Sequence, residues 1–368
     1  MNTQPKPKHI APPEAHKPTP PLLLDVAHRT LSRANILQVR RVGFHGHTAD
    51  DRSPESFPFP ACLTSYMETI GEGYGDITIY AHNRNYTKRL ANSAFLGASG
   101  MAFGLLWSDD LDYRTMDLSQ ITPREETIDR AFRWAGHAYT LYHAGEFDLN
   151  MLNRLIMQTI DAGIPVLAFG LCGSGDCSII AGYENFAASL IGWSHFQSEN
   201  PKDCTENGMF RLKDWDREVN VLIIPGEKTG RTLTYEEAIR HGCEIMRLTE
   251  AGVGARYAAG QNTHEHWQKQ IAEAGALDEA ALAQLHRYHC DILFNFAECR
   301  AWGADFLRDA GYEQAAVNFM QIHDLCWKAR RAADTVEDFR DPANRKLLKD
   351  ILQEISKLDA SAASLLEK

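Results

Sequence analysis

The chain has 368 residues, 44% of them hydrophobic, and a formal net charge of −11 at pH 7. Its length favours two compact domains, and its apolar fraction is enough to fill sizeable cores. The negative charge and the scattered Lys and Arg argue against nucleic acid or an anionic membrane as the main partner, because phosphate binding needs a clustered basic face.

The N-terminal residues 1–22 are rich in Pro and Lys and have no apolar period, which predicts a disordered tail. They lack the basic-then-apolar order of a signal peptide, and no apolar run approaches the roughly 20 residues that span a bilayer. We therefore expect a cytoplasmic protein. In that reducing compartment the eight cysteines should be free thiols, and the absence of C-x-x-C spacing argues against structural zinc.

The next segment places a cysteine at the start of a helix. Prolines interrupt residues 54–60, and Leu63, Met67 and Ile70 then follow Cys62 at helical spacing. This pattern predicts a short helix with Cys62 at or near its N-terminus.

The remaining elements divide the chain into a mixed and a helical part. Residues 95–107 are apolar, rich in small side chains and interrupted by glycines, and amphipathic helices are predicted at 125–136 and 149–162. Strands separated by short turns follow, which is typical of an antiparallel sheet; they are predicted at 164–169, 178–183, 189–193 and 219–224. Long helical periods then occupy 234–249, 257–274, 278–303, 312–333 and 341–366. We expect an α+β domain over 23–228 and an all-α domain over 229–368.

Cys62 is the first candidate for chemistry. A helix N-terminus carries about half a positive charge, which favours a thiolate over a thiol. The backbone N–H groups there can also stabilise an oxyanion. The competing interpretation is that Cys62 is a small buried apolar residue, which is the commoner role of a lone cysteine.

Several segments of the sequence also carry a family resemblance. They are Pro60-Ala61-Cys62-Leu63, Gly97-Ala98-Ser99-Gly100-Met101-Ala102-Phe103, Gly163-Ile164-Pro165-Val166 and Ile179-Ile180-Ala181-Gly182-Tyr183-Glu184. Together they resemble the family named for the butirosin-biosynthesis protein H, in the papain-like clan near the bacteriocin-processing peptidase-like proteins. The helical half is similar to the C-terminal domain of that family.

The resemblance implies a papain-like cysteine-peptidase fold, with a helix packed on an antiparallel sheet, and acyl chemistry without a cofactor. The butirosin protein moves an acyl group from a carrier-protein thioester to an amine, and its clan neighbours cleave peptides. Both reactions use a Cys nucleophile, a His base and an Asp or Asn orienting group. The chain is therefore expected to be a thiol-dependent acyltransferase or amide hydrolase that acts on a small molecule or a peptide.

The sequence departs from this pattern at the base. The strand that runs into Gly182 should begin with His, but Asp176 or Cys177 occupies that place. His195 follows the third strand and is one replacement, and His45 or His47 folding over the site is another. If none acts, the domain is a catalytically inactive papain-like protein that binds a ligand or partner. In a third interpretation, the helical half carries the function as an interaction module.

The substrate is expected to be a small molecule, a peptide or a carrier-protein thioester. The residues expected to contact it are Gly97, Ser99, Trp107, Tyr183 and Trp193. His286 and His289 share a helical face, but solvated helix histidines are commoner than ligands, and no metal site is expected. A homo-oligomer is left open.

Overall fold

The computed structural model describes residues 34–42, 55–81, 84–116, 120–173, 176–198 and 201–367. The predicted tail over 1–22, and His45 and His47, lie outside these ranges. Arg33–Lys368 form one compact unit, and its mixture of helices and antiparallel strands confirms the α+β class. The boundary near residue 228 stays a prediction.

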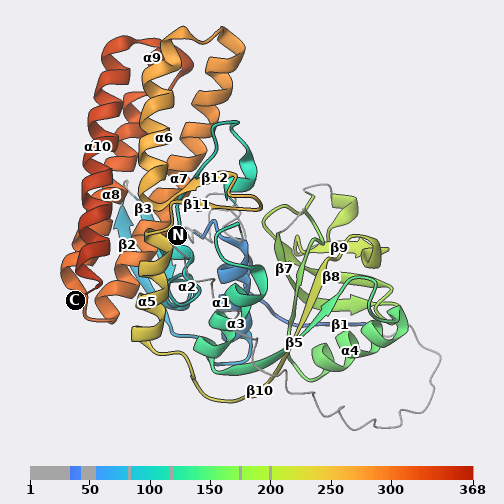
Figure 1. Ribbon diagram of the computed structural model, residues 1–368. Coiled ribbons are helices and arrows are strands. Elements are labelled where there is room, and N and C mark those ends of the chain that lie inside the picture. Colours follow the sequence, from blue (N-terminus) through green and yellow to red (C-terminus); the bar gives the residue numbers. More distant parts are fainter. Residues whose placement is uncertain are drawn as a thin grey trace, which may run out of the picture. The chain divides into compact units, whose positions relative to one another are not determined.

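The main sheet is antiparallel throughout and has the strand order β5-β10-β6-β7-β8-β9, with β1 paired to β7 (Figure 1). Its strands are β1 (Asn35–Ile36), β5 (His137–His143), β6 (Val166–Phe169), β7 (Cys177–Glu184), β8 (Ser189–Ser194), β9 (Phe210–Lys213) and β10 (Val221–Lys228). The antiparallel prediction is thus confirmed, and the four predicted strands correspond to β6, β7, β8 and β10. The strands β1, β5 and β9 were not predicted.

Helices cover both faces of this sheet. Leu167 and Phe169 of β6 join the apolar cluster that contains α1 (Pro58–Thr69) and α3 (Arg124–Ala135). Val166 and Ala168 point the other way, into a cluster with α4 (Leu149–Asp161). Alternate side chains of a strand face opposite sides, so the central strand β6 is buried between two helical layers.

The described residues also form two smaller β units. A hairpin is formed by β2 (Asp76–Ala81) and β3 (Arg84–Arg89), and a three-stranded unit by β4 (Leu106–Trp107), β12 (Tyr257–Ala259) and β11 (Glu250–Ala251). The helix α2 (Leu90–Ala98) follows β3 directly. None of these elements was predicted; β4, β11 and β12 have only two or three residues, and α2 is apolar on most sides.

The C-terminal region is mainly helical, as predicted, but the short strands β11 and β12 lie within the residues that were expected to be all-α. Its helices are α5 (Tyr235–Met246), α6 (Gly260–Glu273), α7 (Glu279–Asp309), α8 (Glu313–Ala332), α9 (Val336–Arg340) and α10 (Pro342–Leu365). Single turns of 3-10 helix occur at η1 (Met101–Phe103), η2 (Tyr113–Met116), η4 (Pro201–Asp203), η5 (Trp215–Arg217) and η6 (Ala274–Ala276). Within the described residues, none of the helices combines the length and apolarity that crossing a membrane requires.

A buried ionic network joins the C-terminal helices. Arg300 on α7 donates to Asp359 on α10 at 3.0 and 2.8 Å, and His264 on α6 lies 3.2 Å from the same carboxylate. Arg300 also donates to the carbonyl oxygen of Ala102 in η1 at 2.6 Å. Because removing one partner of such a network leaves a buried charge unpaired, these residues fix the helices to the segment that follows α2.

Candidate active site

Cys62 lies in the second turn of α1. Pro58 and Pro60 stand in the first turn, where backbone N–H groups have no partner inside the helix, so prolines are tolerated. The field of a helix terminus falls off within one turn, so Cys62 lies just beyond its strongest part. Its side chain is completely buried, with 0% exposure.

The neighbour of the Cys62 thiol is Cys177, the first residue of β7. The thiol of Cys62 donates to the carbonyl oxygen of Cys177 at 3.5 Å, where α1 packs on β7. Burial raises the pKa of the Cys62 thiol well above its ordinary value, and the Cys177 thiol adds to this effect, whereas Arg89 opposes it. The thiol is therefore held in its protonated form at neutral pH.

Asp176 belongs to the turn between β6 and β7. Its carbonyl oxygen accepts a hydrogen bond from the Gly170 N–H at 3.0 Å. Its carboxylate lies against Gly173, where a β-carbon would come within 2.7 Å of Asp176 Oδ2. Of the two residues expected in the place of the base, Cys177 is the one beside Cys62.

His195 contacts the segment that enters α1. It follows β8, is buried, and its Nε2 lies 2.7 Å from the carbonyl oxygen of Glu55. Glu55 stands seven residues before Cys62 in the sequence. His195 thus reaches the site through this segment and holds it in place.

Glu55 and Arg89 form a buried ion pair beside Cys62. Arg89 Nε donates to both carboxylate oxygens of Glu55, at 2.7 and 2.9 Å, and Nη2 donates to the same carboxylate. Arg89 Nη1 donates to Ser65 Oγ at 2.7 Å and to Glu68 at 3.1 Å. Burial acts to lower the pKa of Arg89, but Glu55 and Glu68 outweigh burial and raise it. The guanidinium therefore stays charged and ties the segment before α1 to the start of α2.

A second buried carboxylate links this segment to the C-terminal helices. Glu298 of α7 accepts hydrogen bonds from the Ser56 N–H at 2.6 Å and from Trp302 Nε1 at 3.3 Å. The pKa of Glu298 is raised to about 7: burial is the main cause, hydrogen bonds from Ser56 and Trp302 oppose it, and the nearby Glu55 charge adds to it. A carboxylate that titrates near neutral pH beside a candidate site is a feature that functional sites share with structural ion networks.

Glu55 and Arg89 were not predicted as site residues. Glu55 lies among prolines and Arg89 directly precedes an apolar stretch, and neither position forms a motif. The two residues are 34 positions apart and meet only because the β2–β3 hairpin brings Arg89 back to α1. No spacing rule could have paired them.

Four of the five expected substrate-binding residues pack inside the protein. A β-carbon on Gly97 would lie 2.1 Å from the Phe306 ring. The Trp107 ring stacks on Trp267 with centroids 5.1 Å apart. The hydroxyl of Tyr183 donates to Asp161 at 2.8 Å, and Trp193 Nε1 donates to the Val39 carbonyl oxygen at 3.2 Å. The structure accounts for these residues by packing and hydrogen bonding.

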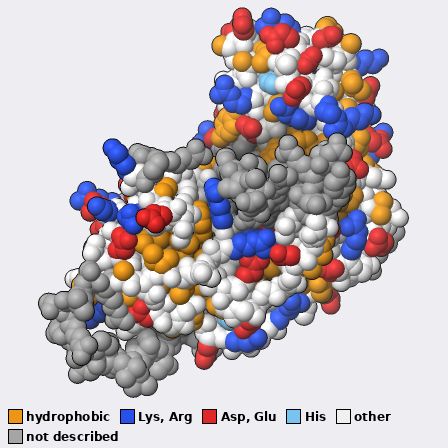
Figure 2. All heavy atoms as spheres, turned by 180° about the vertical axis from the view of Figure 1, so that it is seen from behind, with side chains coloured by type: hydrophobic (Ala, Val, Ile, Leu, Met, Phe, Trp, Pro, Cys, Tyr) orange, Lys and Arg blue, Asp and Glu red, His pale blue; other side chains and the backbone are white. Residues whose placement is uncertain are grey.

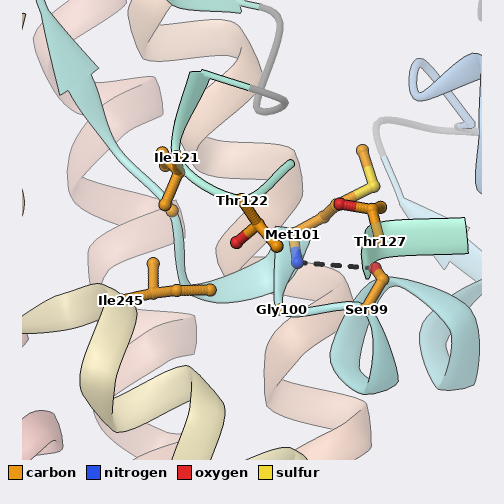
Figure 3. A pocket seen from close by; sticks show the side chains of 8 residues that line it. Ser99, Gly100, Met101, Ile121, Thr122, Thr127 and Ile245 are labelled. Atoms are coloured by element: carbon orange, nitrogen blue, oxygen red, sulfur yellow. Dashed lines mark hydrogen bonds between the residues drawn. The ribbon is translucent and has the colours of Figure 1, made fainter. Parts of the chain in front are cut away.

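Ser99, the fifth expected substrate-binding residue, lines a small pocket (Figure 3). Its Oγ lies 3.5 Å from the backbone nitrogen of Met101, which also faces the pocket, as do Thr122 and Ile245. The cavity volume of this pocket is about 10 Å³, which is about the space of a single water molecule and far below that of a small-molecule site. It is too small for a peptide or a carrier-linked acyl group.

The histidines considered as metal ligands make other contacts. His286 Nε2 lies 3.0 Å from the Ala333 carbonyl oxygen, and His289 Nδ1 accepts a hydrogen bond from Trp267 Nε1 at 2.9 Å. Among the residues that the structure describes, no group of three or more His, Cys, Asp or Glu is arranged to hold a metal ion.

The face shown in Figure 2 carries no uniformly basic patch among the described residues, and the comparisons with known proteins point to no further site. Lys and Arg side chains are interspersed with Asp and Glu over the described part of the face in Figure 2. No protein-family model and no curated protein sequence matches the chain.

Proposed function

We propose that the region around Cys62 has a papain-like arrangement. In support, α1 packs on β7 of an antiparallel sheet, and Cys62 of the helix meets Cys177 at the start of the strand. These are the two positions that the family resemblance assigns to the nucleophile and the base. The proposal includes a cytoplasmic location, since all eight cysteines are free thiols.

The function that this geometry supports best is binding of a small ligand or a partner without thiol catalysis. One observation carries it: the thiol of Cys62 is fully buried and faces a second thiol, with its pKa raised by burial. Only a thiolate is a strong nucleophile. An ordinary cysteine with a pKa of about 8.5 is roughly 3% ionised at pH 7, and each further unit by which the pKa rises lowers that fraction about tenfold.

Thiol labelling tests the proposal. The native protein is treated with iodoacetamide at about pH 7.5, and labelled peptides are mapped by mass spectrometry over time. We expect Cys204, whose sulfur donates to the Ser198 carbonyl oxygen in an exposed hydrogen bond, to react first. Cys62 and Cys177 should react only after denaturation. Preferential labelling of Cys62 in the native protein would refute the proposal.

The second candidate is a thiol-dependent acyltransferase or amide hydrolase acting on a small molecule or a peptide. It is favoured by the place of Cys62 in the first half of α1 and by the charge of Arg89, which opposes the rise that burial causes in the pKa of the thiol. It requires substrate binding to open the site. An acyl-thioester probe distinguishes the two candidates. If the protein becomes stably acylated or turns the probe over, and Cys62→Ala abolishes this, the enzyme is supported. If the protein leaves the probe unchanged, binding without thiol catalysis is supported.

A further inference from the structure

The two outer strands of the main sheet differ in how they are protected. At one edge, β9 has four residues, and Arg211 and Lys213 are two of them. At the other edge, β5 has seven residues, His-Ala-Tyr-Thr-Leu-Tyr-His, with no Lys, Arg, Asp, Glu or Pro. Proteins protect free edges by shortness, charge or proline, because an open edge pairs readily with another strand. By its length and charge β9 is protected, whereas β5 has none of the three kinds of protection and has no neighbouring strand on its outer side among the described residues.

The register of β5 and β10 shows which backbone groups face outward. Ala144 N–H donates to the Asn220 carbonyl oxygen at 2.9 Å, and the strands pair antiparallel from there. Hydrogen-bonded pairs alternate with non-bonded pairs in such a ladder, so Thr140 and Tyr142 bond to β10, whereas Tyr139 and Leu141 direct their N–H and C=O groups away from it. Pro225 stands opposite Tyr139. It has no N–H to donate, which agrees with a non-bonded pair at this position.

We propose that β5 is a homodimer interface, in which two copies pair their β5 strands antiparallel about a twofold axis at Thr140. Tyr139 of each copy then lies opposite Leu141 of the other. Both pairs exchange N–H···O=C bonds, which gives four hydrogen bonds from groups that have no partner among the described residues. The two main sheets would become one continuous sheet, and the edge would no longer be open.

The side chains of β5 are also self-complementary about this axis. Thr140 meets Thr140 of the second copy, and Thr–Thr pairs stabilise adjacent strands. Tyr142 lies opposite Ala138, so a large side chain faces a small one. Within one copy the ring of Tyr142 contacts that of Phe147, with centroids 4.7 Å apart, and Phe147 is 39% exposed. Pairing would therefore cover an aromatic surface beside the strand as well as the edge itself.

Measuring the mass of the full chain in solution is the first test, by sedimentation equilibrium at several concentrations. We expect twice the chain mass of 41.3 kDa. Thr140→Lys places two like charges directly opposite each other and should return the mass to one chain, whereas Thr140→Val keeps the shape and should stay dimeric. A wild-type protein that stays monomeric, or a Thr140→Lys variant that stays dimeric, would overturn the proposal.

Cysteine crosslinking tests the register. Residues in a non-hydrogen-bonded pair have close β-carbons, so Thr140→Cys should form an intermolecular disulfide under mild oxidation, identified as two copies of the same peptide joined through position 140. Tyr142→Cys is the matched control, because this residue lies opposite Ala138 and far from its own copy. Circular dichroism confirms that both variants are folded. Absence of the position-140 crosslink, or equal crosslinking at position 142, contradicts the twofold axis at Thr140.

Discussion

Replacing Glu298 by glutamine should change how the stability of the protein depends on pH. Burial raises the pKa of this carboxyl from 4.5 to about 7 in the folded protein. The folded state therefore binds the proton more tightly than the unfolded chain does. The stability that this proton contributes is fully present below about pH 4.5 and is lost as the pH rises to about 7. At about 1.4 kcal/mol for each pH unit, the loss amounts to about 3 kcal/mol.

A glutamine at position 298 cannot titrate, and its amide oxygen can still accept the hydrogen bonds from Ser56 and Trp302. We expect Glu298→Gln and the wild type to have similar free energies of unfolding at about pH 4, and the variant to be more stable by about 3 kcal/mol at about pH 8. Urea unfolding at several pH values between these limits measures the difference.

The matched control for this experiment is Glu354→Gln, since Glu354 is a half-exposed helix residue paired with Lys357. It should leave the pH profile of the free energy of unfolding unchanged. The reasoning fails if the free-energy difference between wild type and Glu298→Gln is constant across this pH range.

Two further substitutions test packing and charge near the site. Gly97→Ala places a β-carbon 2.1 Å from the Phe306 ring and should lower the free energy of unfolding by about 1–3 kcal/mol. In the control Gly73→Ala, the added β-carbon meets only the flexible Glu68 side chain at 3.1 Å and the Glu68 α-carbon at 3.5 Å, so this variant should lose less free energy of unfolding. Equal urea midpoints for the two variants would contradict the assigned packing. Arg89→Met leaves the Glu55 carboxylate buried without its partner and should cost about 3–5 kcal/mol. Adding Glu55→Gln should recover part of that loss, and a double variant no more stable than Arg89→Met would refute the pairing.

The sequence by itself predicted the long helices and the central strands. Gly136 adopts a left-handed backbone with φ 78° and ends α3 where the prediction placed its end. Thr234 and Glu237 form a capping box at the start of α5. Caps and periodicities are local, so they can be recognised without tertiary information. The same is true of the short apolar runs of β6 and β7, which are buried on both faces.

Tertiary structure decided the character of the candidate site. The sequence placed Cys62 near a helix start, but only packing shows that its thiol is buried against Cys177. The pKa of a thiol depends on desolvation and on charges brought in from distant segments. Arg89 and Glu298 reach the segment before α1 from a hairpin and from a C-terminal helix. Such long-range contacts leave no periodic trace in a single sequence, and for that reason the burial of the thiol had to come from the fold.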